Sequence, residues 1–121
     1  MKKQVSRDGL IRTTVNELLR QGATDLQVVD SAVFSPPSLI KGVSPDICCR
    51  IGELNIIVVV ETESSLNTSA ARHRWATLIA VAQRNNGLFV PAVEPGLSGK
   101  ANDLHRELTR FSVLTLPPQR P

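Results

Sequence analysis

The pattern of apolar and polar residues predicts an amphipathic helix over residues 7–21. Apolar side chains recur there at helical spacing, at Ile11, Val15, Leu18 and Leu19. Ser6 is a suitable N-cap, because its hydroxyl can accept a hydrogen bond from an amide of the first turn. Gly22 is typical of the position just beyond a helix C-terminus. The chain therefore begins with a helix that has one apolar face.

Three strands are predicted next, over residues 25–30, 46–51 and 54–60. The third is the clearest, because it is β-branched and apolar on both faces. This composition is typical of a central strand that helices cover on each side. Between the first two strands, Pro36 and Pro37 predict a loop, because proline has no amide hydrogen to give to a sheet.

The second half of the chain predicts a helix over residues 70–84, a strand over 88–93, and a helix that begins at Ser98 or Gly99. A last strand is predicted over residues 111–116. Strand-helix-strand units around one doubly covered strand indicate an α/β fold, with a mixed sheet flanked by helices. The last helix and strand are additions to this core.

The 121 residues predict a single domain over residues 1–121, with frayed tails at 1–5 and 117–121. The longest apolar run, residues 56–60, is too short to span a bilayer, and no signal peptide is visible. The adjacent Cys48 and Cys49 are expected to be buried thiols in a reducing compartment. We therefore expect a cytoplasmic protein with no membrane partner.

The candidate catalytic or metal-binding residues are acidic residues at the ends of predicted strands. Asp46 begins the second predicted strand, and Glu61 and Glu63 follow the third. A hairpin between these strands would bring Asp46 close to Glu61, and Mg²⁺ prefers carboxylate oxygens as ligands. The alternative is that these acids only face solvent or cap the following helix. Spacing alone leaves both interpretations open.

A resemblance to a known family favours the first interpretation. The chain resembles the PD-(D/E)xK nuclease-like superfamily, which includes restriction endonucleases and has an α-β-β-β-α-β core. The residues that carry the resemblance are Pro45-Asp46-Ile47, the acidic stretch over residues 59–66, Arg74-Trp75, and Leu88-Phe89-Val90-Pro91. They resemble a bacterial subgroup with glutamate at the position of the motif lysine, and the match covers roughly residues 8–93.

The chain departs from the family pattern in two positions. If Thr62 and Leu66 set the register, Glu61 takes the lysine position and Val59 takes that of a metal-binding acid. A shift by two residues makes Glu61 the acid and Glu63 the lysine substitute, but the Thr-to-Leu spacing then no longer fits. We favour the first register. The motif lysine is absent in both.

The resemblance implies a Mg²⁺- or Mn²⁺-dependent endonuclease that cuts DNA phosphodiesters. Asp46 and Glu61 would hold the metal, with Glu63 as a further catalytic residue and Glu17 of the first helix joining the metal site. A glutamate can replace the lysine only as a base or through a second metal. The alternative is an inactive nuclease-fold module without a cofactor, which binds nucleic acid or a protein. Glu17 can equally be a solvated helix residue.

Basic residues near the motif are the candidates for phosphate contacts. Arg72 and Arg74 lie at the start of the helix that follows the acidic stretch, and Lys41 precedes Pro45 in the loop. The net charge of +3 permits contact with DNA without requiring it. A homodimer is consistent with the family, although no residue in the sequence demands one.

Overall fold

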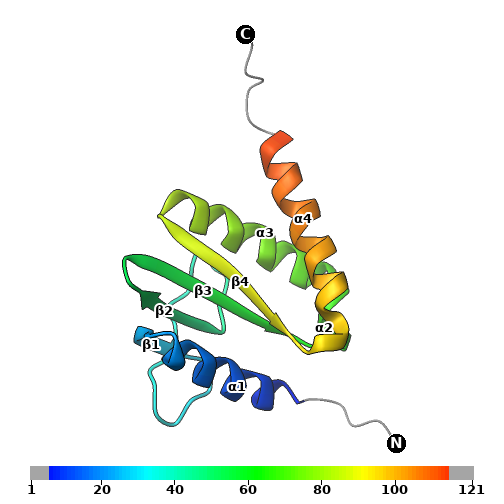
Figure 1. Ribbon diagram of the computed structural model, residues 1–121. Helices are drawn as coiled ribbons and strands as arrows, with labels where there is room; N and C mark the ends of the chain where they lie inside the picture. The colour runs from blue at the N-terminus through cyan, green and yellow to red at the C-terminus, as the bar shows by residue number, and fades with distance from the viewer. Residues whose placement is uncertain (1–5, 115–121) are drawn as a thin grey trace, which may run out of the picture.

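The computed structural model describes residues 6–114, apart from the side chains of Pro95 and of residues 110–114. Its elements, shown in Figure 1, are α1 (Arg7–Arg20), β1 (Thr24–Val28), β2 (Ile47–Ile51), β3 (Leu54–Glu61), α2 (Glu63–Leu66), α3 (Ser69–Arg84), β4 (Gly87–Val93), the 3₁₀ helix η1 (Pro95–Leu97) and α4 (Ser98–Leu114).

The four strands form one mixed sheet in the order β1-β2-β3-β4. The first three strands are antiparallel neighbours, and β4 runs parallel to β3. A parallel neighbour requires a crossover, which α3 supplies. The register pairs Ile47 with Val58 and Val58 with Val90, so β3 is an inner strand with a partner on each side. The predicted α/β fold with a mixed sheet flanked by helices is confirmed.

Helices cover both faces of this sheet, with α1 on one side and α3 and α4 on the other (Figure 1). Successive residues of a strand point to opposite faces, so β3 contributes to both cores. Ile56, Val58 and Val60 pack in the core on the α1 side. Ile57 and Val59 pack in the core on the α3 side. The predicted double cover of the central strand is thus confirmed.

Several predicted boundaries agree with the structure to within a few residues. The Ser6 hydroxyl caps α1 by accepting a hydrogen bond from the Gly9 amide at 3.0 Å. Gly22 follows the helix with a φ of +89°, a conformation that glycine adopts without strain. Thr68 caps α3, which begins one residue earlier than predicted. These ends depend on local hydrogen bonds, which is why the sequence reveals them.

Glu63 lies in the short helix α2, where Thr62 and Ser65 form a capping box that follows the end of β3. One prediction about local structure is wrong. Residues 111–114 continue α4 and do not form the predicted strand. Leu104, Leu108 and Phe111 keep helical spacing, which the strand prediction overlooked. The rest of that strand and both predicted tails lie outside the described residues.

The predictions about the thiols and the membrane are settled in part. Cys49 is buried and Cys48 half-buried, and neither forms a disulfide. Burial, together with the nearby Cys49 thiol, raises the pKa of Cys48 to about 11. Within residues 6–114, no helix has the length and apolar character needed to cross a bilayer. The cellular location stays a prediction.

Candidate functional site

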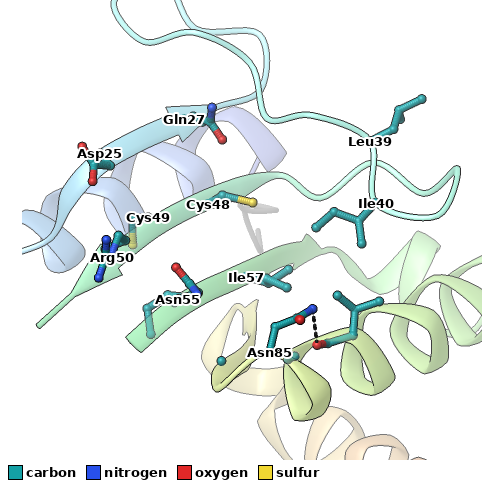
Figure 2. A pocket seen from close by; sticks show the side chains of 14 residues that line it. Asp25, Gln27, Leu39, Ile40, Cys48, Cys49, Arg50, Asn55, Ile57 and Asn85 are labelled. Carbon is teal, nitrogen blue, oxygen red and sulfur yellow. Dashed lines mark hydrogen bonds between the residues drawn. The ribbon is translucent and has the colours of Figure 1, made fainter. Parts of the chain in front are cut away.

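Two openings lie near opposite ends of β3. Figure 2 shows a groove of about 760 Å³ near the start of this strand, whose lining includes Gln27, Cys48, Ile57 and Asn85. A smaller cleft of about 440 Å³ lies at the end of β3, between α1 and the start of α3. Three of the predicted site residues, Asp46, Glu61 and Arg74, lie together beside the smaller cleft.

The sheet brings Asp46 and Glu61 together, as the sequence predicts. Asp46 directly precedes β2, and its amide bonds to the carbonyl of Val58 at 3.0 Å. This pairing places Asp46 beside the carboxyl end of β3, where Glu61 is the last residue. Asp46 is 2% exposed and Glu61 is 1% exposed. Both carboxylates are therefore buried at one corner of the sheet.

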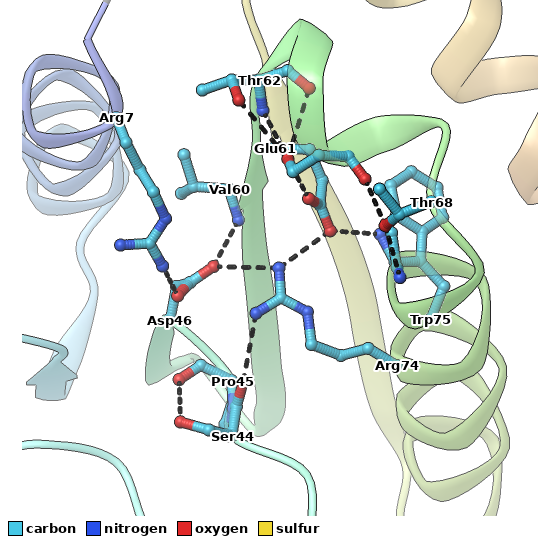
Figure 3. A network of polar contacts seen from close by, with 12 residues as sticks. Arg7, Ser44, Pro45, Asp46, Val60, Glu61, Thr62, Thr68, Arg74 and Trp75 are labelled. Atoms are coloured by element: carbon cyan, nitrogen blue, oxygen red, sulfur yellow. Dashed lines mark hydrogen bonds and ion pairs between the residues drawn. The ribbon is translucent and has the colours of Figure 1, made fainter.

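Each oxygen of the Asp46 carboxylate accepts a hydrogen bond (Figure 3). Oδ1 accepts from a terminal amino group of Arg7, which reaches down from the start of α1. Oδ2 accepts from the Val60 amide at 2.7 Å and lies 3.5 Å from a terminal nitrogen of Arg74. Asp46 thus joins helices from both faces of the sheet to β3.

Both oxygens of the Glu61 carboxylate also accept hydrogen bonds. Its Oε2 accepts from Arg74 at 2.8 Å and from the indole nitrogen of Trp75 at 2.9 Å. Its Oε1 accepts from the Ser65 hydroxyl at 2.6 Å. The same nitrogen of Arg74 therefore lies between the two carboxylates, as Figure 3 shows. Among the side chains that the structure describes, no buried nitrogen or oxygen lacks a partner.

The network balances its charges. Two buried carboxylates meet two arginines, Arg7 and Arg74, whose side chains are 38% and 24% exposed. Burying a carboxylate without a partner is costly, so the arginines make the burial of Asp46 and Glu61 tolerable. The carboxylates lie underneath, and the partly exposed guanidinium groups lie closer to solvent. A ligand entering the cleft meets positive charge first.

The arrangement does not fit a preformed magnesium site. Mg²⁺ requires oxygen ligands in octahedral geometry, while both carboxylates already hold Arg74. The described part of the chain contains no group of three or more His, Cys, Asp or Glu side chains placed to hold a metal. Val59 is 0% exposed and packs in the core with Trp75 and Leu78.

The other predicted site residues lie outside this network. Glu17 is on the exposed side of α1 and bonds to Arg20 and Gln21, whereas Glu63 is exposed in α2. Lys41 is exposed at a turn of the β1–β2 loop, with a φ of +52°. Arg72 pairs with Glu107 of α4 at 2.8 Å. Of the seven predicted residues, the structure gathers Asp46, Glu61 and Arg74.

Sequence reasoning missed three members of the network. Arg7 is 39 residues from Asp46, and no spacing pattern links them. Trp75 is buried in the core and also donates to Glu61, a contact that the sequence does not reveal. Ser65 follows Glu61 by four residues and belongs to the capping box of α2. The capping signature of Thr62 and Ser65 is the one local signal that points to the site.

Comparison of the chain with protein-family models gives no match, and comparisons with curated proteins and with solved structures give none either. Inferences about function therefore depend on this chain's own residues and contacts.

Proposed function

We propose that this chain is a restriction-endonuclease-like module that binds nucleic acid and does not cleave it. The observation that carries the proposal is the position of Arg74, whose guanidinium lies 2.8 Å from Glu61 and 3.5 Å from Asp46. In the superfamily that the chain resembles, the acid at the Asp46 position holds a divalent cation, and in the favoured register Glu61 stands at the position of the motif lysine. Here an arginine supplies the positive charge. The order of α1, the three antiparallel strands, α3 and β4 supports the same fold.

The chemistry of arginine explains why this exchange opposes cleavage. An arginine stays protonated at any physiological pH, so Arg74 cannot accept a proton from an attacking water. A metal ion would have to displace Arg74 and make up for the bonds that Asp46 and Glu61 lose. The buried Val59 adds no third carboxylate. The network therefore favours a structural role for both acids.

Nucleic acid is the partner that the remaining charges favour. The chain carries a net charge of +3, and Arg7 and Arg74 present partly exposed guanidinium groups at the cleft. Guanidinium groups bind phosphate oxygens with two parallel hydrogen bonds. Binding that depends on phosphate contacts weakens steeply as salt rises.

The proposal is tested by measuring binding and cleavage on the same DNA. We expect short labelled DNA to bind with an affinity that falls as salt is raised from 50 to 200 mM. With Mg²⁺ or Mn²⁺, plasmid and oligonucleotides should stay intact, as with an Asp46→Ala control. Titration calorimetry should show no saturable Mn²⁺ binding. Metal-dependent cleavage that Asp46→Ala abolishes would overturn the proposal.

One observation favours a second candidate, a Mg²⁺-dependent nuclease that uses Asp46 and Glu61 as ligands. Arg74 is 24% exposed and borders an open cleft, so its long side chain has room to move aside. Trp75 separates the two candidates, because it is the only tryptophan in the chain and bonds to Glu61. Saturable quenching of its fluorescence by Mn²⁺, but not by Ca²⁺ at equal ionic strength, supports the nuclease. No saturable quenching supports the binding module.

A further inference from the structure

The cleft at the end of β3 has hydrogen-bond donors that have no partner among the residues that the structure describes. A guanidinium group carries five N–H donors. Within residues 6–114, Arg7 bonds through one terminal nitrogen to Asp46, and Arg74 bonds through its two terminal nitrogens to Asp46, Glu61 and the Ser44 carbonyl. Both side chains line the cleft. Their remaining donors are available to an anion there.

The charge pattern of α3 points to the same ligand. Helix N-termini are stabilised by acidic residues, because the first amides of a helix have no partners inside it. The first turn of α3 has no acid, and basic residues follow at Arg72, His73 and Arg74. Ala70 and Ala71 line the cleft at this end of the helix, so a ligand can approach the backbone closely.

Hydroxyl groups complete the lining. Thr62, Ser64, Ser65 and Thr68 all border the cleft. Ser64 is exposed, and its hydroxyl is 3.1 Å from that of Thr62. A hydroxyl can donate one hydrogen bond while it accepts others. Ser65 and Thr68 already donate to Glu61 and to the Ser65 carbonyl, so the hydroxyl donor on the α2 side comes from the Thr62–Ser64 pair. It adds to the guanidinium donors from α1 and α3.

We propose that this cleft binds the terminal phosphate of a nucleic-acid strand, an inference that rests on the proposed function. Donors converge on the cleft from α1, from α2 and from α3. A terminal phosphate presents three free oxygens and up to two negative charges, whereas an internal phosphodiester presents two oxygens and one charge. The terminal group therefore satisfies more of these donors at once. Asp46 and Glu61 lie beneath the arginines and keep them in place.

The test compares single-stranded oligonucleotides that differ only at their ends. Fluorescence anisotropy is measured with a 12-mer that carries a 5′-phosphate, a 3′-phosphate or hydroxyl groups at both ends, at one fixed salt concentration. We expect a phosphorylated end to bind about tenfold more tightly, which is the strength of one charge-assisted contact. Inorganic phosphate at millimolar concentration should weaken the binding of the phosphorylated strands more than that of the hydroxyl-ended strand.

Variants test whether the preference for a phosphorylated end depends on the cleft. Arg7→Gln should reduce it to less than about twofold, because one of two guanidinium groups is lost. Arg12→Gln removes the same charge from an exposed position on the same helix and should leave the preference intact. Because a change at Arg74 threatens folding, Ser64→Asp is the second cleft variant. It places a carboxylate on an exposed wall and should abolish the preference.

The outcomes separate the two proposals. Equal affinity for phosphorylated and hydroxyl-ended strands overturns the terminal-phosphate site and leaves nucleic-acid binding standing. A preference that survives both Arg7→Gln and Ser64→Asp also overturns it, because the phosphate then binds elsewhere. No binding of any strand overturns both proposals. Loss of the preference in the two cleft variants, with Arg12→Gln unchanged, supports the site.

Discussion

The two openings near the ends of β3 differ in what they can recognise. The groove near the start of the strand is the larger, at about 760 Å³ against about 440 Å³ for the cleft at its end. Its lining mixes apolar side chains with amides, two thiols, and one charge of each sign, Asp25 and Arg50. The smaller cleft lies over four paired charges. Volume alone therefore does not single out the functional opening.

The difference follows from how each end of the sheet is closed. At the end of β3, α1 and α3 extend arginines over the sheet from opposite faces (Figure 3). Near its start, the long β1–β2 loop forms part of the wall through Leu39 and Ile40, as Figure 2 shows. A loop wall of aliphatic side chains brings no charge to the groove. Helices that begin beside strand ends bring charge and free amides to the cleft.

The largest expected effect comes from breaking the charged network. Arg74→Met should lower the free energy of unfolding by about 3 kcal/mol or more, because it leaves two buried carboxylates short of a partner. Urea denaturation measures the change. Arg72→Met is the matched control: it removes an exposed pair with Glu107 from the same helix and should cost less than about 1 kcal/mol. Equal losses of unfolding free energy would show that the buried network stabilises the protein no more than an exposed ion pair does.

A smaller loss is expected when a neutral donor is removed. Ser65→Ala should destabilise the protein by about 1–3 kcal/mol, because Oε1 of the buried Glu61 loses its hydrogen bond. The neighbouring Ser64→Ala, at an exposed position, should change stability by less than about 0.5 kcal/mol. Thermal unfolding of the two variants side by side tests this contrast. A larger loss for Ser64→Ala than for Ser65→Ala would contradict the assigned contacts.

The thiol of Cys48, which lines the groove, allows a prediction about how stability depends on pH. Burial raises the pKa of Cys48 from 9.0 to about 11, so the folded protein keeps this proton where an unfolded chain releases it. Stability from Cys48 is thus full below pH 9 and declines towards pH 11. Iodoacetamide should modify Cys48 in a Cys49→Ala variant at least about tenfold more slowly than a free thiol at pH 8. A rate that levels off near pH 9 would contradict the raised pKa.

The smallest expected effect is that of a charge removed from the groove, which should leave DNA binding unchanged, in contrast to a charge removed from the cleft. Arg50→Gln removes a positive charge from the groove, and Arg7→Gln removes one from the cleft. At matched salt, only Arg7→Gln should weaken DNA binding and flatten its dependence on salt concentration. Anisotropy titrations at several salt concentrations measure both quantities. Equal weakening by Arg50→Gln would indicate that net charge, and not the cleft, controls binding.

Much of the fold was predictable because its signals are local. The cap at Ser6, the spacing of Trp75 and Leu78, and the apolar run over residues 56–60 each depend on nearby residues. The end of β3 was predicted to within one residue, at residue 60 against the observed Glu61, and the capping box of Thr62 and Ser65 follows it directly. The hairpin between β2 and β3 was also sufficient to predict that Asp46 approaches Glu61.

By itself, the sequence determined the order of α1, the four strands, α3 and α4, the double cover of β3, and the approach of two acids at one strand end. Only the tertiary structure decided what those acids bind. Arg7 and Arg74 come from helices on opposite faces of the sheet, 39 and 28 positions away from Asp46 in the chain. No local pattern encodes such pairs, because they exist only once both helices have packed. Packing thus paired two buried acids with two partly exposed arginines that line a cleft.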